Sequence, residues 1–122
     1  MTFKTEQEEF WAGSFGTEYI DRNKSDSLLA SNLNFFSKAL RCAHGINSCI
    51  EFGANIGMNL RALNLLYPSI DAYGVEINRD AANHLADTIP SSNVFNTSIL
   101  DFESVIECDL VLIKGVLIHM NP

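Results

Sequence analysis

Positive charge is scarce in this chain of 122 residues. Lysine and arginine together number 8 against 15 acidic residues, which gives a formal net charge of −7 at pH 7. A nucleic-acid groove needs clustered cations, and no basic stripe in the sequence supplies one. The composition therefore excludes nucleic acid as an expected partner.

Cysteine and long apolar runs are scarce as well. The 3 cysteines, Cys42, Cys49 and Cys108, are an odd number at wide spacings, which is typical neither of a disulfide framework nor of a metal site. No apolar run approaches the roughly 20 residues of a membrane span. The N-terminus, MTFKTEQEE, is too acidic for a signal peptide. We expect a cytoplasmic protein with no metal and no membrane partner.

The most informative segment is residues 48–60, SCIEFGANIGMNL. Its apolar start predicts a short buried strand over 49–52. Gly53 and Gly57 then permit a tight turn and a close approach of the backbone to a ligand, before a helix over 58–66. This order of strand, glycine turn and helix is typical of a cofactor-binding site.

Two carboxylates indicate which cofactor would bind there. Glu76 closes the next strand, predicted over 72–77, where a carboxylate can accept hydrogen bonds from both hydroxyls of a ribose. Glu51 lies beside the glycine turn, where it would repel a pyrophosphate but suit an ammonium or sulfonium group. Asn55 also replaces the middle glycine of the dinucleotide fingerprint. These residues favour S-adenosylmethionine over a dinucleotide.

Alternating strands and helices predict the fold class. We expect an α/β protein with a Rossmann-like parallel sheet and helices on both faces, and a ligand at the carboxyl ends of the strands. The cofactor-binding domain is assigned to residues 25–122. Its further predicted elements are a helix from Ser25 or Ser27 to 43, a helix capped by Asn78 and reaching 88, a strand over 94–97, a turn or short helix over 101–106, and a strand over 109–114.

Residues 1–24 form a polar segment with a series of aromatic side chains. Trp11, Phe15 and Tyr19 would share one face of a helix. The segment is either a hydrophobic clasp that holds the N-terminus on the domain or a lid over the cofactor. We favour the clasp for Trp11 and Phe15, and both interpretations stay open for Tyr19 and Arg22, which would face the cofactor in a lid.

Four segments together carry a resemblance to a known family. They are EQEEFWAGSFGTEYIDRN, EFGANIGMNL, YGVEIN and DLVLIKGVLIHMNP. The chain resembles the Rossmann-like S-adenosylmethionine-dependent methyltransferases and, more narrowly, the methylases associated with pseudaminic acid biosynthesis. The resemblance implies methyl transfer to a small polar acceptor, such as a sugar or nonulosonic acid precursor of a bacterial surface glycan.

The resemblance also implies roles for residues at the ends of the first two strands. Glu76 would bind the ribose, and Ile77 would pack on one face of the adenine. The residues that would surround the methionine part of the cofactor are Glu51, Gly53, Ala54, Asn55 and Gly57.

The resemblance implies further contacts after the third and fourth strands. In such proteins the turn after the third strand gives an acidic side chain to the adenine amino group and a backbone N–H to the ring. Here Ser98 occupies the first turn position, Ile99 follows it, and Asp101 lies further on, so either Ser98 or Asp101 would make the amino contact. Backbone groups of Lys114 and Gly115 would contact the methionine end.

The C-terminal residues bear on whether the chain can catalyse methyl transfer. His119 would be a general base in the whole enzyme, or a histidine on the first turn of a helix that packs against a following segment, and we prefer the second interpretation. Such methyltransferases continue with three further strands, so we expect a chain truncated after its fourth strand. The alternatives to an active methyltransferase are a catalytically inactive cofactor-binding fragment or pseudo-enzyme, and a nicotinamide-dependent oxidoreductase.

Overall fold

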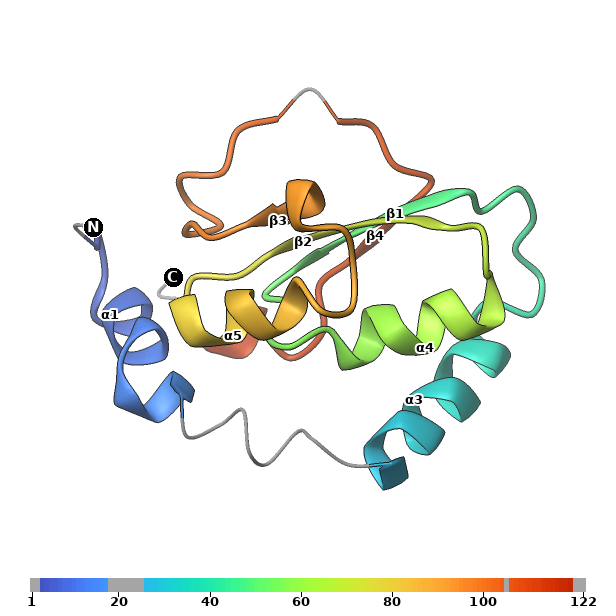
Figure 1. The fold of residues 1–122 in the computed structure, drawn as a ribbon, viewed down its shortest axis with the longest axis horizontal. Coiled ribbons are helices and arrows are strands. Elements are labelled where there is room, and N and C mark those ends of the chain that lie inside the picture. The colour runs from blue at the N-terminus through green and yellow to red at the C-terminus, as the bar shows by residue number, and fades with distance from the viewer. Residues whose placement is uncertain (1–2, 18–25, 105, 120–122) are drawn as a thin grey trace.

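The fold is built on one parallel sheet. A computed structural model of the chain describes residues 3–17, 26–104 and 106–119. The sheet has the order β3-β2-β1-β4, with all strand pairs parallel (Figure 1). Its strands are β1 (Ser48–Phe52), β2 (Asp71–Val75), β3 (Val94–Phe95) and β4 (Leu110–Leu112). Because the chain steps outward from β1 to β3 and then returns to the other side of β1, strand order reverses between β1 and β4. Such a reversal opens a crevice at the carboxyl ends.

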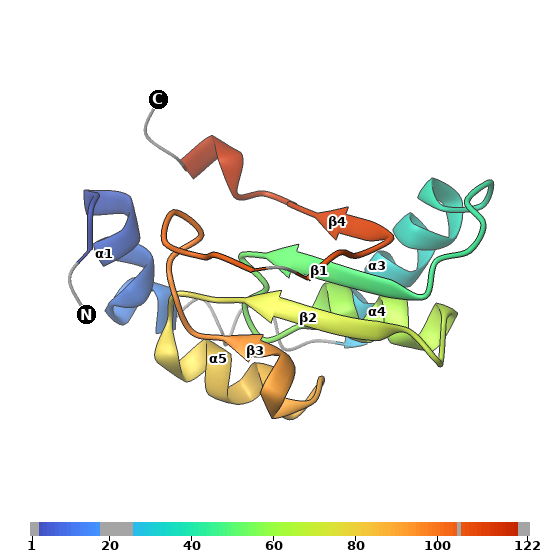
Figure 2. The same cartoon turned by 90° about the horizontal axis from the view of Figure 1, so that it is seen from above.

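Three helices cover one face of this sheet (Figures 1 and 2). They are α3 (Asp26–Ala39), α4 (Met58–Leu66) and α5 (Arg79–Leu85). Leu60 and Leu63 of α4 and Leu85 of α5 are fully buried in the core beneath the strands. Burying each such side chain contributes roughly 1.5–3 kcal/mol. Asn78 caps α5 through a hydrogen bond that its side-chain oxygen accepts from the Ala81 N–H at 3.0 Å.

A long connection, rather than a helix, crosses the opposite face of the sheet (Figure 1). Residues 96–104 and 106–109 contain no helix, and the turn or short helix predicted over 101–106 is a turn that ends at Asp101. Phe102 holds this connection against the sheet, with its ring centroid 5.6 Å from that of Phe52 and 5.1 Å from that of Phe95. Aromatic packing therefore replaces helix packing on this face.

Helix α1 (Glu6–Ala12) lies apart from the others, beside the carboxyl ends of the strands (Figures 1 and 2). A capping box starts it, because Thr5 Oγ1 accepts from the Glu8 N–H while the Glu8 carboxylate accepts from the Thr5 N–H. The rings of Trp11 and Phe15 pack edge to face, with centroids 5.3 Å apart. The segment thus covers the edge of the sheet where a ligand was expected.

The predicted Rossmann-like parallel sheet is confirmed, and the helix over 58–66 has the predicted bounds. The second strand ends at Val75, earlier than predicted, so that Glu76 lies just beyond the sheet. Tyr19 and Arg22 fall outside the described residues. Within the described ranges, no helix has both the length and the apolar character to cross a membrane.

Candidate functional site

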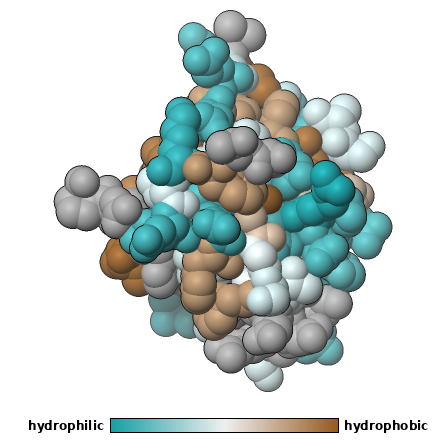
Figure 3. Space-filling model, turned by 90° about the vertical axis from the view of Figure 1, so that its left-hand side faces the viewer, coloured by the Kyte–Doolittle hydropathy of each residue, from teal (hydrophilic) through white to brown (hydrophobic). Residues whose placement is uncertain are grey.

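A cavity of about 420 Å³ lies at the carboxyl edge of the sheet. Its walls come from the strand ends on one side and from α1 and α3 on the other. The volume lies within the range of small-molecule sites. Figure 3 shows this side of the molecule, where hydrophobic and hydrophilic residues lie next to one another. A mixed surface of this kind suits a ligand with both apolar and polar parts.

The glycine turn after β1 forms the floor of the cavity. Gly53 has a φ of +77°, and a Cβ added there would come within 2.5 Å of Val116 Cγ2. The N–H groups of Gly53 and Ala54 both donate to the carbonyl of Val75, at 2.9 and 3.0 Å. These bonds tie the turn to the end of β2. Only glycine combines this backbone conformation with this close approach.

Glu76 projects into the cavity from the end of β2 and is 8% exposed. Its Oε1 accepts from the Asn55 N–H at 2.8 Å, and its Oε2 accepts from the Asn78 N–H at 2.7 Å. Burial raises the pKa of Glu76, and the backbone N–H donors, with that of Asn78 foremost, oppose this rise. The carboxylate is therefore held rigidly at the cavity wall, and each oxygen retains a lone pair for a ligand donor.

Glu51 lies behind the cavity wall rather than in it. The side chain is 1% exposed, and its Oε2 accepts from Asn59 Nδ2 at 2.7 Å. Its Oε1 is buried and has no hydrogen-bond partner among the described residues. Burial raises the pKa of Glu51 to about 8, although the Asn59 hydrogen bond and the charge of Lys114 both lower it. Asn59, which does line the cavity, separates this carboxyl group from the open space.

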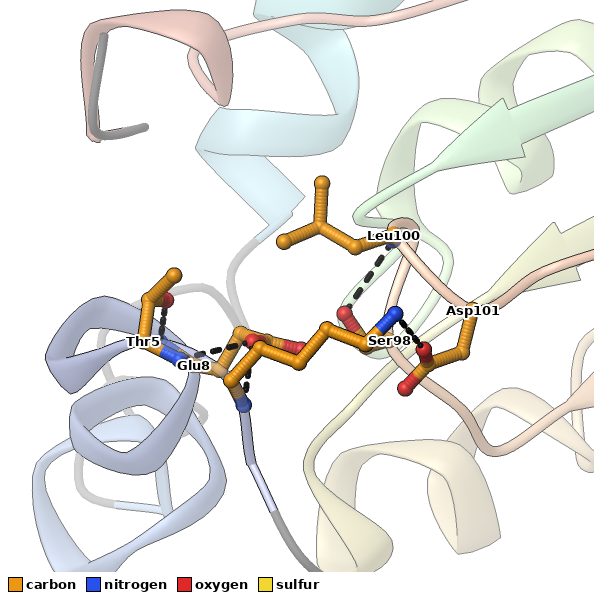
Figure 4. Close-up of polar contacts among 6 residues, drawn as sticks. Thr5, Glu8, Ser98, Leu100 and Asp101 are labelled. Atoms are coloured by element: carbon orange, nitrogen blue, oxygen red, sulfur yellow. Dashed lines mark hydrogen bonds and ion pairs between the residues drawn. The ribbon is translucent and has the colours of Figure 1, made fainter.

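The turn after β3 brings Ser98 into the cavity wall and leaves Asp101 outside it. Ser98 is 2% exposed, and its Oγ accepts from the Leu100 N–H at 3.1 Å. Asp101 instead pairs with Lys4, whose Nζ lies 2.5 Å from its Oδ1 (Figure 4). Of the two residues proposed for the adenine contact, only Ser98 is therefore positioned at the cavity.

Helix α1 forms one wall of the cavity, and the sequence did not predict which of its residues line it. Thr5, Gln7, Glu8 and Trp11 line the cavity from this helix. Its C-terminal end is held by Asn78, whose Nδ2 lies 3.1 Å from the carbonyl oxygen of Trp11. The capping box, Thr5-x-x-Glu8, was the available signal for this helix, but nothing local indicated which face it would turn toward the site.

Most of the predicted cofactor-binding residues line the cavity, and their roles remain predictions. Glu51 and Gly57 lie outside its lining, and Leu28, Asn32, Met58, Asn59 and Thr97 are lining residues that were missed. His119 ends the 3₁₀ helix η2 (Leu117–His119). Among the described residues, no cluster of His, Cys, Asp or Glu could hold a metal ion. The residues of the predicted set that line the cavity are Gly53, Ala54, Asn55, Glu76, Ile77, Ser98, Ile99 and Lys114.

Comparison with known proteins shows which solved structures share this fold. No protein-family model and no curated protein matches the sequence. Several solved structures do match it. The plantazolicin methyltransferase BpumL, in complex with SAH, superposes with a TM-score of 0.63 at 19% identity, over 88% of this chain and 44% of that chain. The sugar N-methyltransferase KedS8 from a Streptoalloteichus species gives 0.62 at 19% identity, over 84% and 40%.

DesVI of Streptomyces venezuelae gives a TM-score of 0.57 at 14% identity, over 91% of this chain and 44% of that chain. At these identities the similarity shows the fold. The chain has the Rossmann-like fold found in these methyltransferases, and it spans less than half the length of the chains it matches.

Proposed function

We propose that this chain binds S-adenosylmethionine and forms the cofactor-binding part of a methyltransferase. The observation that carries the proposal is Glu76, a buried carboxylate held at the cavity wall by the N–H groups of Asn55 and Asn78. Two adjacent hydroxyls of a ribose match its two oxygens, because each hydroxyl can donate to one of them. The fold and the SAH bound in the BpumL structure support the same assignment.

The remaining lining residues fit the two ends of this cofactor. Ile77, Ser98 and Ile99 lie at the β3 end of the cavity, where an adenine would have apolar contacts and a hydroxyl. Gly53 and the backbone at 114–116 lie at the β1 and β4 end, where the methionine part would bind. Glu51 lies behind Asn59 at this end, and a positive ammonium group bound nearby would lower its raised pKa and so favour the ionised carboxylate. When bound, the cofactor supplies an electrophilic methyl group on sulfur.

We further propose a small polar acceptor, either a sugar or a nonulosonic acid precursor of a bacterial surface glycan. Two points support this class: the sequence resemblance to methylases associated with pseudaminic acid biosynthesis, and the structural similarity to KedS8, whose name describes a sugar N-methyltransferase. Alignment of the acceptor with the methyl group would supply much of the rate. His119 remains a candidate general base.

Calorimetric titration with S-adenosylhomocysteine and, separately, with NAD tests the cofactor. We expect binding of S-adenosylhomocysteine and none of NAD. Glu107→Ala serves as a control variant, because it changes an exposed carboxylate and should leave the affinity for S-adenosylhomocysteine unchanged. Binding of NAD in place of S-adenosylhomocysteine would overturn the proposal. The acceptor class is tested by transfer of a labelled methyl group to sugar nucleotides and, in parallel, to peptides.

A further inference from the structure

Glu8 is a buried residue on α1, and only one oxygen of its carboxylate accepts hydrogen bonds from the described residues. The side chain is 7% exposed and lines the cavity. Its Oε1 accepts from the N–H groups of Lys4 and Thr5, at 2.8 and 3.0 Å. Its Oε2 is buried and has no hydrogen-bond partner among the described residues. The hydrogen bonds at the start of α1 therefore use one oxygen of this carboxylate. The other oxygen remains available as an acceptor in the cavity wall.

The start of α1 is linked to the turn after β3. Lys4, at the start of the capping box, pairs with Asp101, and the Asp101 N–H donates to the carbonyl of Ser98 at 3.1 Å. Figure 4 shows the first turn of α1 joined in this way to the turn after β3. Glu8 and Ser98 line the same cavity. Glu8 therefore lines the cavity from a helix whose N-terminal end is linked to the turn after β3.

The two side chains offer complementary hydrogen-bonding groups. The Ser98 hydroxyl accepts from the Leu100 N–H, which leaves its own O–H to donate. The Glu8 carboxylate can only accept. A donor and an acceptor on the wall of one cavity suit the edge of an adenine, whose 6-amino group donates and whose ring nitrogen N1 accepts. Hypoxanthine reverses both, because it has an oxygen at position 6 and an N–H at position 1.

We propose that Glu8 Oε2 accepts a hydrogen bond from the 6-amino group of the cofactor's adenine and makes the site selective for an adenosyl over an inosyl group. This inference rests on the proposed function, since it assigns the base-recognition residue of the same site. The N-terminal helix would supply the hydrogen-bond acceptor for the amino group of the base, and the turn after β3 would supply a hydroxyl. Base recognition would then depend on the docking of α1.

Glu8→Gln tests this role without removing the cap, because glutamine also serves at this position of a capping box. With the amide oxygen on the N–H groups of Lys4 and Thr5, the amide nitrogen replaces Oε2 and presents a donor to the ligand. Calorimetry would compare S-adenosylhomocysteine with S-inosylhomocysteine. We expect the wild-type chain to prefer the adenosyl ligand by about tenfold or more. The variant should lose about tenfold for this ligand and gain affinity for the inosyl one.

Glu9→Gln is the matched control, because Glu9 is an exposed carboxylate on the same helix and its change should leave both affinities unaltered. Unchanged discrimination in Glu8→Gln, with S-adenosylhomocysteine still bound, would overturn the inference and leave the proposed function intact. Equal affinity of the wild-type chain for the two ligands would overturn it without any variant. A wild-type chain that binds neither ligand would instead overturn the proposed function.

Discussion

Glu51 and Glu76 occupy the ends of neighbouring strands and yet have different surroundings. Glu51 is paired in register with Gly74 inside the sheet, so its side chain lies under the turn, with a single hydrogen bond from Asn59. Glu76 follows the last residue of β2 and projects into the cavity, with an N–H donor on each oxygen. Burial raises the pKa of both. The comparison shows that the point where a strand ends decides whether a carboxylate faces the cavity or the protein interior.

Gly53→Val should have the largest effect, because it changes the turn that separates the two carboxylates. A side chain there would meet Val116 and require a positive φ, and we expect S-adenosylhomocysteine binding to be lost in calorimetry. Gly45→Val is the control. Gly45 also has a positive φ, of +71°, but a Cβ there meets nothing within 4 Å, so binding should survive. Near-normal affinity of Gly53→Val would show that the ligand binds elsewhere.

Glu76→Ala and Glu51→Ala test the comparison directly. Glu76→Ala should weaken S-adenosylhomocysteine by about one to three decades, since hydrogen bonds to a charged acceptor contribute roughly 1.5–3 kcal/mol each. It should also lower the thermal unfolding temperature, because the N–H groups of Asn55 and Asn78 lose their acceptor. Glu51→Ala should weaken binding less, since Glu51 does not line the cavity. The reverse order of affinities would contradict the placement of the ribose at Glu76.

The raised pKa of Glu51 predicts a pH dependence of stability. The folded chain keeps a proton on Glu51 up to a pH of about 8, whereas the unfolded chain loses it near 4.5. The folded state therefore holds more protons in this interval, and stability should fall as the pH rises through it, by at most about 1.4 kcal/mol per pH unit. Denaturant unfolding of wild type and Glu51→Gln across this range measures it. The difference in stability between the two should become independent of pH below about 4.5 and change as the pH rises above it. A constant difference at every pH would contradict the assignment.

Asp101→Asn should have the smallest effect. It removes the ion pair with Lys4, whose side chain is largely exposed, and such pairs contribute little in water. We expect the affinity for S-adenosylhomocysteine to fall by less than about fivefold, with a further reduction of this effect in high salt. A loss as large as that of Glu76→Ala would indicate that Asp101 contacts the ligand, the alternative that the sequence left open.

Much of the fold was predictable because its signals are local. Apolar runs marked the buried strands, Asn78 marked the start of α5, and the glycine turn marked the link between β1 and α4. The end of β2 was predicted too late, because the apolar Ile77 after Glu76 extends the sequence pattern of the strand beyond Val75. The turn or helix predicted over 101–106 is a turn that ends at Asp101, and no helix follows it at 102–104 or 106, where Phe102 packs on the sheet through tertiary contacts.

The sequence by itself determined the parallel α/β sheet, the glycine turn and the presence of carboxylates at two strand ends, because each depends on residues close together in the chain. Only the tertiary structure decided that Glu76 faces the cavity while Glu51 lies behind Asn59, that Ser98 rather than Asp101 lines it, and that α1 closes its far side. These outcomes rest on contacts between distant segments, such as Lys4 with Asp101 and Asn78 with Trp11. No local pattern encodes such contacts, since they form only when the sheet brings its strand ends and the N-terminal helix to one edge.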